Sequence, residues 1–118
     1  MKLSRIESVY ENAMALALRD AGLDATQQAA LSVCFRGTIV GEFRADILVA
    51  GRLVLEVKAV VQLNAAHEVQ LVNYLKASGH RVGLLLNFGP SPRFKRRVYE
   101  QLMNNPRSSA SIRVQKHV

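Results

Sequence analysis

The chain has 118 residues, of which 49% are hydrophobic, a single cysteine and a formal net charge of +7. This length supports one domain with one hydrophobic core, and the composition excludes an intrinsically disordered chain and a disulfide scaffold. We find no signal peptide and no apolar run near the ~18 residues that a membrane helix needs, so we expect a cytoplasmic protein outside the membrane. Cys34 lies in an apolar run, which predicts a buried, inert thiol.

The positive charge is concentrated at one end of the chain. Residues 1–92 hold nine Lys and Arg against eight Asp and Glu, whereas residues 93–118 hold seven against one. Such a basic end favours a polyanionic partner, with nucleic acid first. A solvated tail that keeps the protein soluble explains the charge equally well.

Spacing of apolar residues predicts helices at both ends of a central strand-rich region. The first helix begins with capping-box spacing at Ser4 and Glu7 and ends at Gly22. Its predicted buried stripe consists of Ile6, Val9, Tyr10, Ala13 and Ala17. A second helix, residues 65–78, has Asn64 as its N-cap and Gly79 as its stop.

Three β-branched segments between these helices and one apolar segment after them read as strands. They cover residues 31–37, 38–49, 52–61 and 81–88, while residues 24–30 stay ambiguous and residues 93–104 suggest a basic amphipathic helix. The order α-β-β-β-α-β-α predicts an α/β fold, a mixed β-sheet flanked by helices. We assign residues 1–104 to this domain and residues 105–118 to a basic tail or an added edge strand.

Two carboxylates and an ammonium interrupt the most strand-like segment. Glu56 and Lys58 lie two residues apart and therefore project from one face of a strand. A two-residue turn would place Asp46 on the other face, whereas a three-residue loop at residues 50–52 would place it opposite Glu56. Gly51 suits the left-handed position of a three-residue hairpin loop, so we favour the second register.

In that register the Asp46 and Glu56 carboxylates lie ~5 Å apart across the strands, where like charges repel. A hard divalent cation between them would remove the repulsion, and Mg²⁺ commonly takes only one or two carboxylates and several waters. Lys58 would then orient a water or stabilise charge on a phosphate. An exposed sheet face on which the three charges only pair and solvate has equal weight from the spacing alone.

The pattern D-x₉-E-x-K on a hairpin that follows one helix and precedes another resembles the PD-(D/E)xK nuclease superfamily. The resemblance implies a restriction-endonuclease-like fold in which Asp46, Glu56 and the carbonyl of Val57 hold Mg²⁺ (or Mn²⁺) and Lys58 assists the attacking water. Ala45 stands where the motif has proline, a position that varies widely in the superfamily.

Longer stretches resemble the GxxExxY family of small bacterial and archaeal proteins, which is assigned to the same superfamily. These stretches are "ESVYENAMALALRDAGL", "GEFRADILV", "LEVKAV", "HEVQLVNYLKASGHRVGLLLNFG" and "FKRRV". The signature reads "SRIESVY" here, with Ser4 in place of glycine and with Glu7 and Tyr10 matching.

Two further groups complete the candidate site. Gln70 and Tyr74 form the Q-x-x-x-Y of RecB-type exonucleases, in which these residues sit beside the metal and contact the DNA strand; a polar helix edge is the alternative. Glu7 and Glu11 lie one helical turn apart, which is mildly unfavourable. Capping explains Glu7, so the resemblance makes Glu11 the candidate for the metal-facing glutamate of the first helix.

We therefore expect a Mg²⁺-dependent nuclease that hydrolyses DNA, and a homodimer is one assembly compatible with this function. Its backbone-phosphate contacts would come from Arg93, Lys95, Arg96 and Arg97. The alternatives are an inactive nuclease-fold module that only binds nucleic acid and a subunit of a larger DNA-processing assembly.

Overall fold

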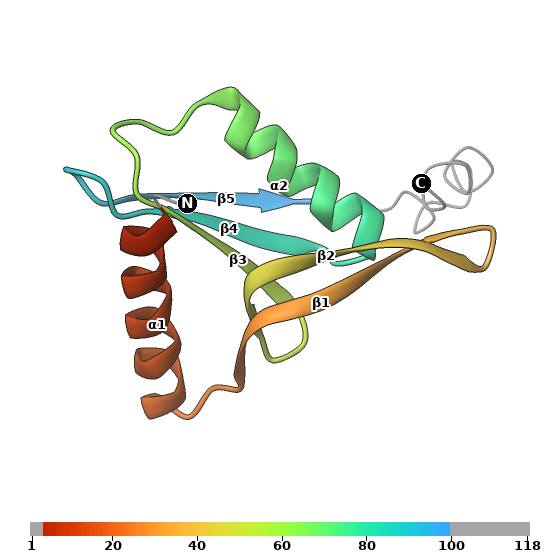
Figure 1. Ribbon diagram of the computed structural model, residues 1–118, viewed down its shortest axis with the longest axis horizontal. Helices are drawn as coiled ribbons and strands as arrows, with labels where there is room; N and C mark the ends of the chain where they lie inside the picture. The colour runs from red at the N-terminus through yellow and green to blue at the C-terminus, as the bar shows by residue number, and fades with distance from the viewer. Residues whose placement is uncertain (1–3, 100–118) are drawn as a thin grey trace.

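The computed structural model describes residues 4–99, which form two helices and five strands (Figure 1). In chain order these are α1 Ser4–Asp20, β1 Ala25–Phe35, β2 Thr38–Val49, β3 Leu53–Lys58, α2 Ala65–Ser78, β4 Val82–Asn87 and β5 Arg93–Val98. Within this part of the chain no helix has the length and apolarity needed to cross a membrane.

All five strands belong to one sheet in the order β1-β2-β3-β4-β5. Neighbouring strands are antiparallel except β3 and β4, which are parallel and are connected through α2. Figure 1 shows α1 and α2 on opposite faces of this sheet. The predicted mixed sheet flanked by helices is therefore confirmed.

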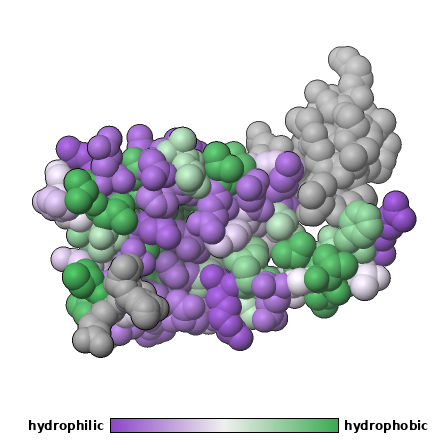
Figure 2. Space-filling model, turned by 45° about the horizontal axis from the view of Figure 1, so that its top comes forward, coloured by the Kyte–Doolittle hydropathy of each residue, from purple (hydrophilic) through white to green (hydrophobic). Residues whose placement is uncertain are grey.

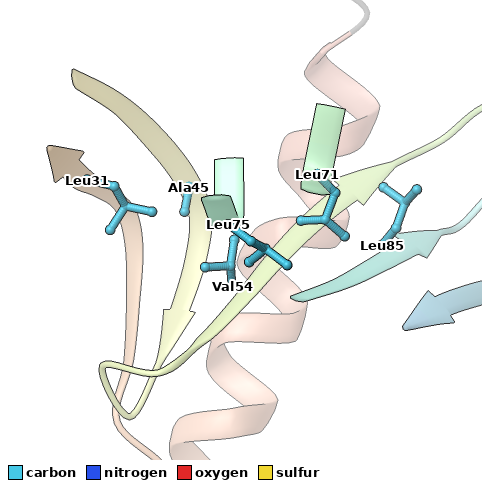
Figure 3. Close-up of a cluster of buried hydrophobic side chains, with 6 residues drawn as sticks. All are labelled: Leu31, Ala45, Val54, Leu71, Leu75 and Leu85. Carbon is cyan, nitrogen blue, oxygen red and sulfur yellow. The ribbon is translucent and has the colours of Figure 1, made fainter. Parts of the chain in front are cut away.

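Each helix covers its own cluster of buried side chains. The α2 face holds the cluster drawn in Figure 3, formed by Leu31, Ala45, Val54, Leu71, Leu75 and Leu85. The α1 face holds a second cluster, formed by Ala15, Ala25, Ile47, Val49 and Leu55. The sheet between them is thus buried on both sides at β3, which explains why Glu56, the one acid of this strand, is conspicuous in the sequence.

The ends of α2 are as the sequence predicts. The Asn64 side chain accepts a hydrogen bond from the backbone of His67, and the His67 ring accepts one from the backbone of Asn64. Gly79 ends the helix in the left-handed conformation, at φ 80°, with its N–H on the carbonyl of Leu75.

The helix predicted over residues 93–104 is wrong in the part that the structure describes. Arg93–Val98 forms β5, which pairs antiparallel with β4 from Val82↔Val98 to Asn87↔Arg93. The apolar strand β4 would otherwise leave a row of backbone groups unpaired at the sheet edge, and this demand outweighs the helical spacing of the basic residues. Residues 100–104 and the predicted tail, 105–118, lie outside the described residues.

The predicted buried stripe of α1 is also wrong. Ile6 and Val9 are 60% and 62% exposed, whereas Glu11 and Ala15 are buried, with Glu7 half-buried on the same face. The helix thus turns its acidic face toward the sheet. The reason is that Glu7 and Glu11 accept hydrogen bonds from N–H groups of the sheet and of the residue that follows β3.

Cys34 is exposed, contrary to the prediction of a buried thiol. The β1–β2 hairpin extends past the core, so that Phe35, Ile39 and Val40 near its end are exposed as well. Figure 1 shows this hairpin projecting from the body of the sheet, and Figure 2 shows apolar surface at the same end of the molecule.

Gly83 offers a test of the packing between β4 and α2. A Cβ at this position would lie 2.8 Å from Leu71 Cδ1, inside the buried cluster, so we expect Gly83→Ala to destabilise the protein by about 1–3 kcal/mol. Gly41→Ala is the matched control, because a Cβ there meets no atom within 4 Å. Chemical denaturation of both variants measures the difference, and equal stabilities would contradict the packing described here.

Candidate active site

The β2–β3 hairpin has the register that the sequence predicts. Ile47 pairs with Leu55 and Val49 with Leu53, which leaves a three-residue loop at residues 50–52. Ala50 and Gly51 both adopt left-handed backbone conformations, at φ 54° and 68°. One step beyond the last pair, this register places Asp46 opposite Glu56.

At that position the side-chain carboxylates of the two acids replace the backbone hydrogen bonds between β2 and β3. The Val57 N–H donates to Asp46 Oδ2 at 2.8 Å, and the Asp46 N–H donates to Glu56 Oε2 at 3.3 Å. Each carboxylate thus takes a backbone donor from the opposite strand, and the paired register ends at Ile47↔Leu55. Within residues 4–99, one oxygen of each acid, Asp46 Oδ1 and Glu56 Oε1, has no backbone donor.

Both carboxyl groups resist ionisation. Burial is the largest cause, and the charge of the Asp46 carboxylate the second, that raises the pKa of Glu56 to about 8. Burial also raises the pKa of Asp46, and the hydrogen bond from Val57 opposes this rise. The Lys58 ammonium lowers both pKa values but does not offset the burial.

These two acids suit a hard divalent cation, because they offer carboxylate oxygens at adjacent positions and gain from a positive charge between them. The Val57 carbonyl, on the residue that bonds Asp46, is the candidate third donor. Residues 4–99 contain no group of three or more His, Cys, Asp or Glu side chains arranged to hold a metal. A pair is sufficient for Mg²⁺, which keeps several of its waters.

Glu11 lies close enough for its charge to raise the pKa of Glu56, but within residues 4–99 it does not form a metal-holding group of three acids with Asp46 and Glu56. Its carboxylate is buried and accepts hydrogen bonds from the side-chain amides of Gln27 and Gln28, both at 3.0 Å. Each Glu11 oxygen thus accepts one neutral N–H donor, and the assignment of Glu11 as a metal ligand stays a prediction.

Glu7 has a role that the sequence analysis missed. Its Oε2 accepts a hydrogen bond from the N–H of Ala59 at 3.1 Å, directly after Lys58. The spacing carries the signal, because residues four apart on a helix share one face and the resemblance assigns Glu11 to the face toward the site.

Lys58 projects from β3 beside the two acids, and its charge acts on the pKa values of both. Its ammonium makes no hydrogen bond or ion pair within residues 4–99, while its backbone is fixed. The Lys58 carbonyl accepts from Phe88 N at 2.8 Å, and the next N–H is held by Glu7. The site therefore contains the Lys58 ammonium on a rigid backbone, with its N–H donors available.

Helix α2 supplies the other predicted pair. Gln70 Nε2 donates to the Tyr74 hydroxyl at 2.9 Å, and the Tyr74 ring stacks on Phe43 with centroids 4.0 Å apart. Burial, followed by the Glu56 and Asp46 carboxylates, raises the pKa of Tyr74. The Q-x-x-x-Y pair thus lies along the edge of α2 that borders the acids.

The four predicted phosphate-binding residues do not share one face of the sheet. Arg97 forms an ion pair with Glu68 of α2, while Arg96 pairs with Leu84 and faces the opposite side of the sheet. Arg93 and Lys95 are exposed and border a groove of about 440 Å³. The groove is lined by Val61, Gln62, Leu63, Asn87, Ser91, Arg93, Phe94 and Lys95.

The groove lies at the end of the strands that carries Lys58. Lys58 pairs with Asn87, and Asn87 in turn pairs with Arg93, so the three residues stand at one level on adjacent strands. The buried Asn87 amide accepts from Val60 N at 2.9 Å and donates to Val60 O at 3.0 Å, which fixes the loop after Lys58.

Known proteins share this sequence pattern and this fold. A family model described as the PD-(D/E)XK nuclease superfamily matches residues 3–104. The chain belongs to the PD-(D/E)XK nuclease superfamily. Nucleases of this superfamily typically use divalent metal ions, in agreement with the acid pair. No curated protein matches the sequence.

Solved structures share the fold at low sequence identity. The crystal structure of SSO0001 superimposes with a TM-score of 0.61 at 15% identity over 98% of this chain, which spans 62% of that protein. An alkaline exonuclease from Laribacter hongkongensis gives 0.49 at 13% identity, covering 92% of this chain and 61% of its own. The Holliday junction resolvase Hjc from Archaeoglobus fulgidus gives 0.46 at 22%, covering 75% and 72%. The restriction-endonuclease-like fold is confirmed by the family and the first of these structures.

The raised pKa of Glu56 predicts a pH-dependent stability without metal. The folded protein binds this proton up to about pH 8, whereas the unfolded chain releases it near 4.5, so stability falls as the pH rises through that window. We expect Glu56→Gln to exceed the original protein in stability by about 1–3 kcal/mol at pH 8.5 in EDTA, and to lose the advantage at pH 5. Urea denaturation at both pH values measures this.

Glu42→Gln is the control for that series, because Glu42 lies on β2 and is exposed. No comparable gain at pH 8.5 is expected for it. The same pH slope in the original protein and in Glu56→Gln would show that the Glu56 carboxyl does not retain its proton in the folded state.

Proposed function

We propose that the protein is a nuclease that uses Mg²⁺ or Mn²⁺ to hydrolyse phosphodiester bonds in DNA. The observation that carries the proposal is the pair of half-buried carboxylates, Asp46 and Glu56, held across two strands beside the Lys58 ammonium. Burying two repelling acids is costly unless a cation uses them. The match of Glu7 and Tyr10 to the GxxExxY signature supports the same reading.

Asp46, Glu56 and the Val57 carbonyl would hold the cation, which when bound supplies Lewis-acid chemistry by acidifying water and neutralising charge on the phosphate. Lys58 would donate hydrogen bonds to the attacking water or to a phosphate oxygen, since its ammonium has no partner within the described residues. Gln70 and Tyr74 would hold the strand at the edge of the site, with the Tyr74 ring fixed by its stack on Phe43.

Backbone phosphates would bind along the groove beside β5. Arg93 and Lys95 are exposed there, about two strand spacings from Lys58, or ~10 Å. Arg96, on the other face, and Arg97, neutralised by Glu68, would contribute less. These contacts give affinity without sequence information, and the choice of DNA over RNA rests on the superfamily resemblance.

The catalytic assignment predicts that Asp46→Asn and Lys58→Ala each lower the cleavage rate by about 10²–10⁴-fold, because each removes a charge beside the reacting phosphate. Glu42→Gln, at an exposed position of β2, should cleave at the original rate. The assay uses labelled single-stranded, duplex and branched DNA with Mg²⁺, Mn²⁺ or EDTA. Salt-sensitive binding without cleavage, unchanged by Asp46→Asn, would instead identify an inactive binding module.

The groove predicts a separate effect on binding. Arg93→Ala and Lys95→Ala should each weaken DNA binding and reduce the slope of log K against log salt by about 1, since each contact releases about one counterion. Arg52→Ala is the matched control, because Arg52 is exposed at the opposite end of β3. Fluorescence anisotropy over a salt series measures the slopes, and equal slopes for all three variants would exclude the groove as the binding path.

A further inference from the structure

Gln28 has a backbone conformation that its place in a strand does not explain. It lies inside β1 with φ 52°, in the left-handed region that costs energy for a residue with a side chain. The pairing of β1 with β2 runs Gln27↔Ile47 and then Ala29↔Ala45, so Gln28 is skipped. The residue skipped on the other strand is Asp46.

The left-handed backbone changes where the Gln28 side chain goes. Successive side chains of a strand normally point to opposite faces. Here the amides of Gln27 and Gln28 both reach the carboxylate of Glu11, at 3.0 Å each. The same Gln28 Nε2 lies 3.4 Å from Asp46 Oδ1, the oxygen that accepts no backbone N–H from the described part of the chain.

One carboxamide therefore connects two acids from different elements. Its NH₂ group carries two hydrogens, one for Glu11 on α1 and one for Asp46 on β2. The backbone carbonyl of Gln28 accepts a hydrogen bond from Arg44 Nη1 at 2.9 Å, which also holds the backbone of this residue in place. The cost of the left-handed backbone at Gln28 is thus offset by hydrogen bonds that Gln28 makes in this conformation.

We propose that Gln28 is a positioning residue that fixes the Asp46 carboxylate for cation binding by linking it to Glu11. The inference rests on the proposed function, since it assigns Asp46 to a cation. Partners that orient a metal ligand affect affinity by about 10–100-fold when they are removed.

Two substitutions separate positioning from folding. Gln28→Gly accepts the left-handed backbone and removes the amide, while Gln28→Asn keeps an amide and tolerates this backbone but is one methylene too short to reach both acids. Gln27→Asn is the matched control, because Gln27 contacts Glu11 and Asn12 but has no hydrogen bond to Asp46. Circular dichroism checks the fold of each variant.

The measurement is the dissociation constant for Mn²⁺ by calorimetry on EDTA-stripped protein without nucleic acid. We expect Gln28→Gly and Gln28→Asn to raise it about 10–100-fold and Gln27→Asn to change it less than twofold. An unchanged constant in the folded Gln28 variants would overturn the inference, as would an equal loss in Gln27→Asn or the unfolding of both Gln28 variants. Failure of the original protein to bind Mn²⁺ would overturn the proposed function itself.

Discussion

Competition between two carboxylates and a β-ladder governs the architecture around this site. Asp46 and Glu56 each accept a backbone N–H from the opposite strand, where a regular hairpin would use carbonyl groups. The β2–β3 pairing accordingly ends at Ile47↔Leu55, and the β1–β2 pairing is interrupted at the same level. At this level β2 also changes which face of the sheet its buried side chains pack on. Ile47 packs on the α1 face, whereas Ala45, two residues earlier, packs on the α2 face.

Around this interruption every acid is matched with N–H donors. Glu7 accepts from the backbone of Ala59, and Glu11 accepts from the amides of Gln27 and Gln28. Such partners explain why α1 buries an acidic face and leaves Ile6 and Val9 exposed. A helix packed by its apolar stripe would leave the half-buried Ala59 N–H and Gln27 amide without these acceptors, and unpaired donors shielded from water are more costly than exposed methyl groups.

Local patterns were sufficient wherever neighbours in the sequence decide the structure. The loop at residues 50–52 and the caps of α2 follow from short-range turn and capping chemistry. The strand β5, the buried face of α1 and the exposed Cys34 depend instead on what other elements leave unpaired or uncovered. The left-handed backbone of Gln28 gave no signal at all, because nothing in "TQQAAL" distinguishes one glutamine from the other.

The balance of costs also separates the two functions that share this fold. A module that only binds nucleic acid needs the basic groove at Arg93 and Lys95, which lies beside β5, two strands away from Lys58. It gains nothing from Glu56, whose burial raises its pKa to about 8, or from strain at Gln28. Replacing Glu56 with an uncharged residue would leave the groove intact and stabilise the sheet. The acid pair, the strained glutamine and a lysine without a partner in residues 4–99 all carry a cost, and the proposed cation would offset the cost of the acids.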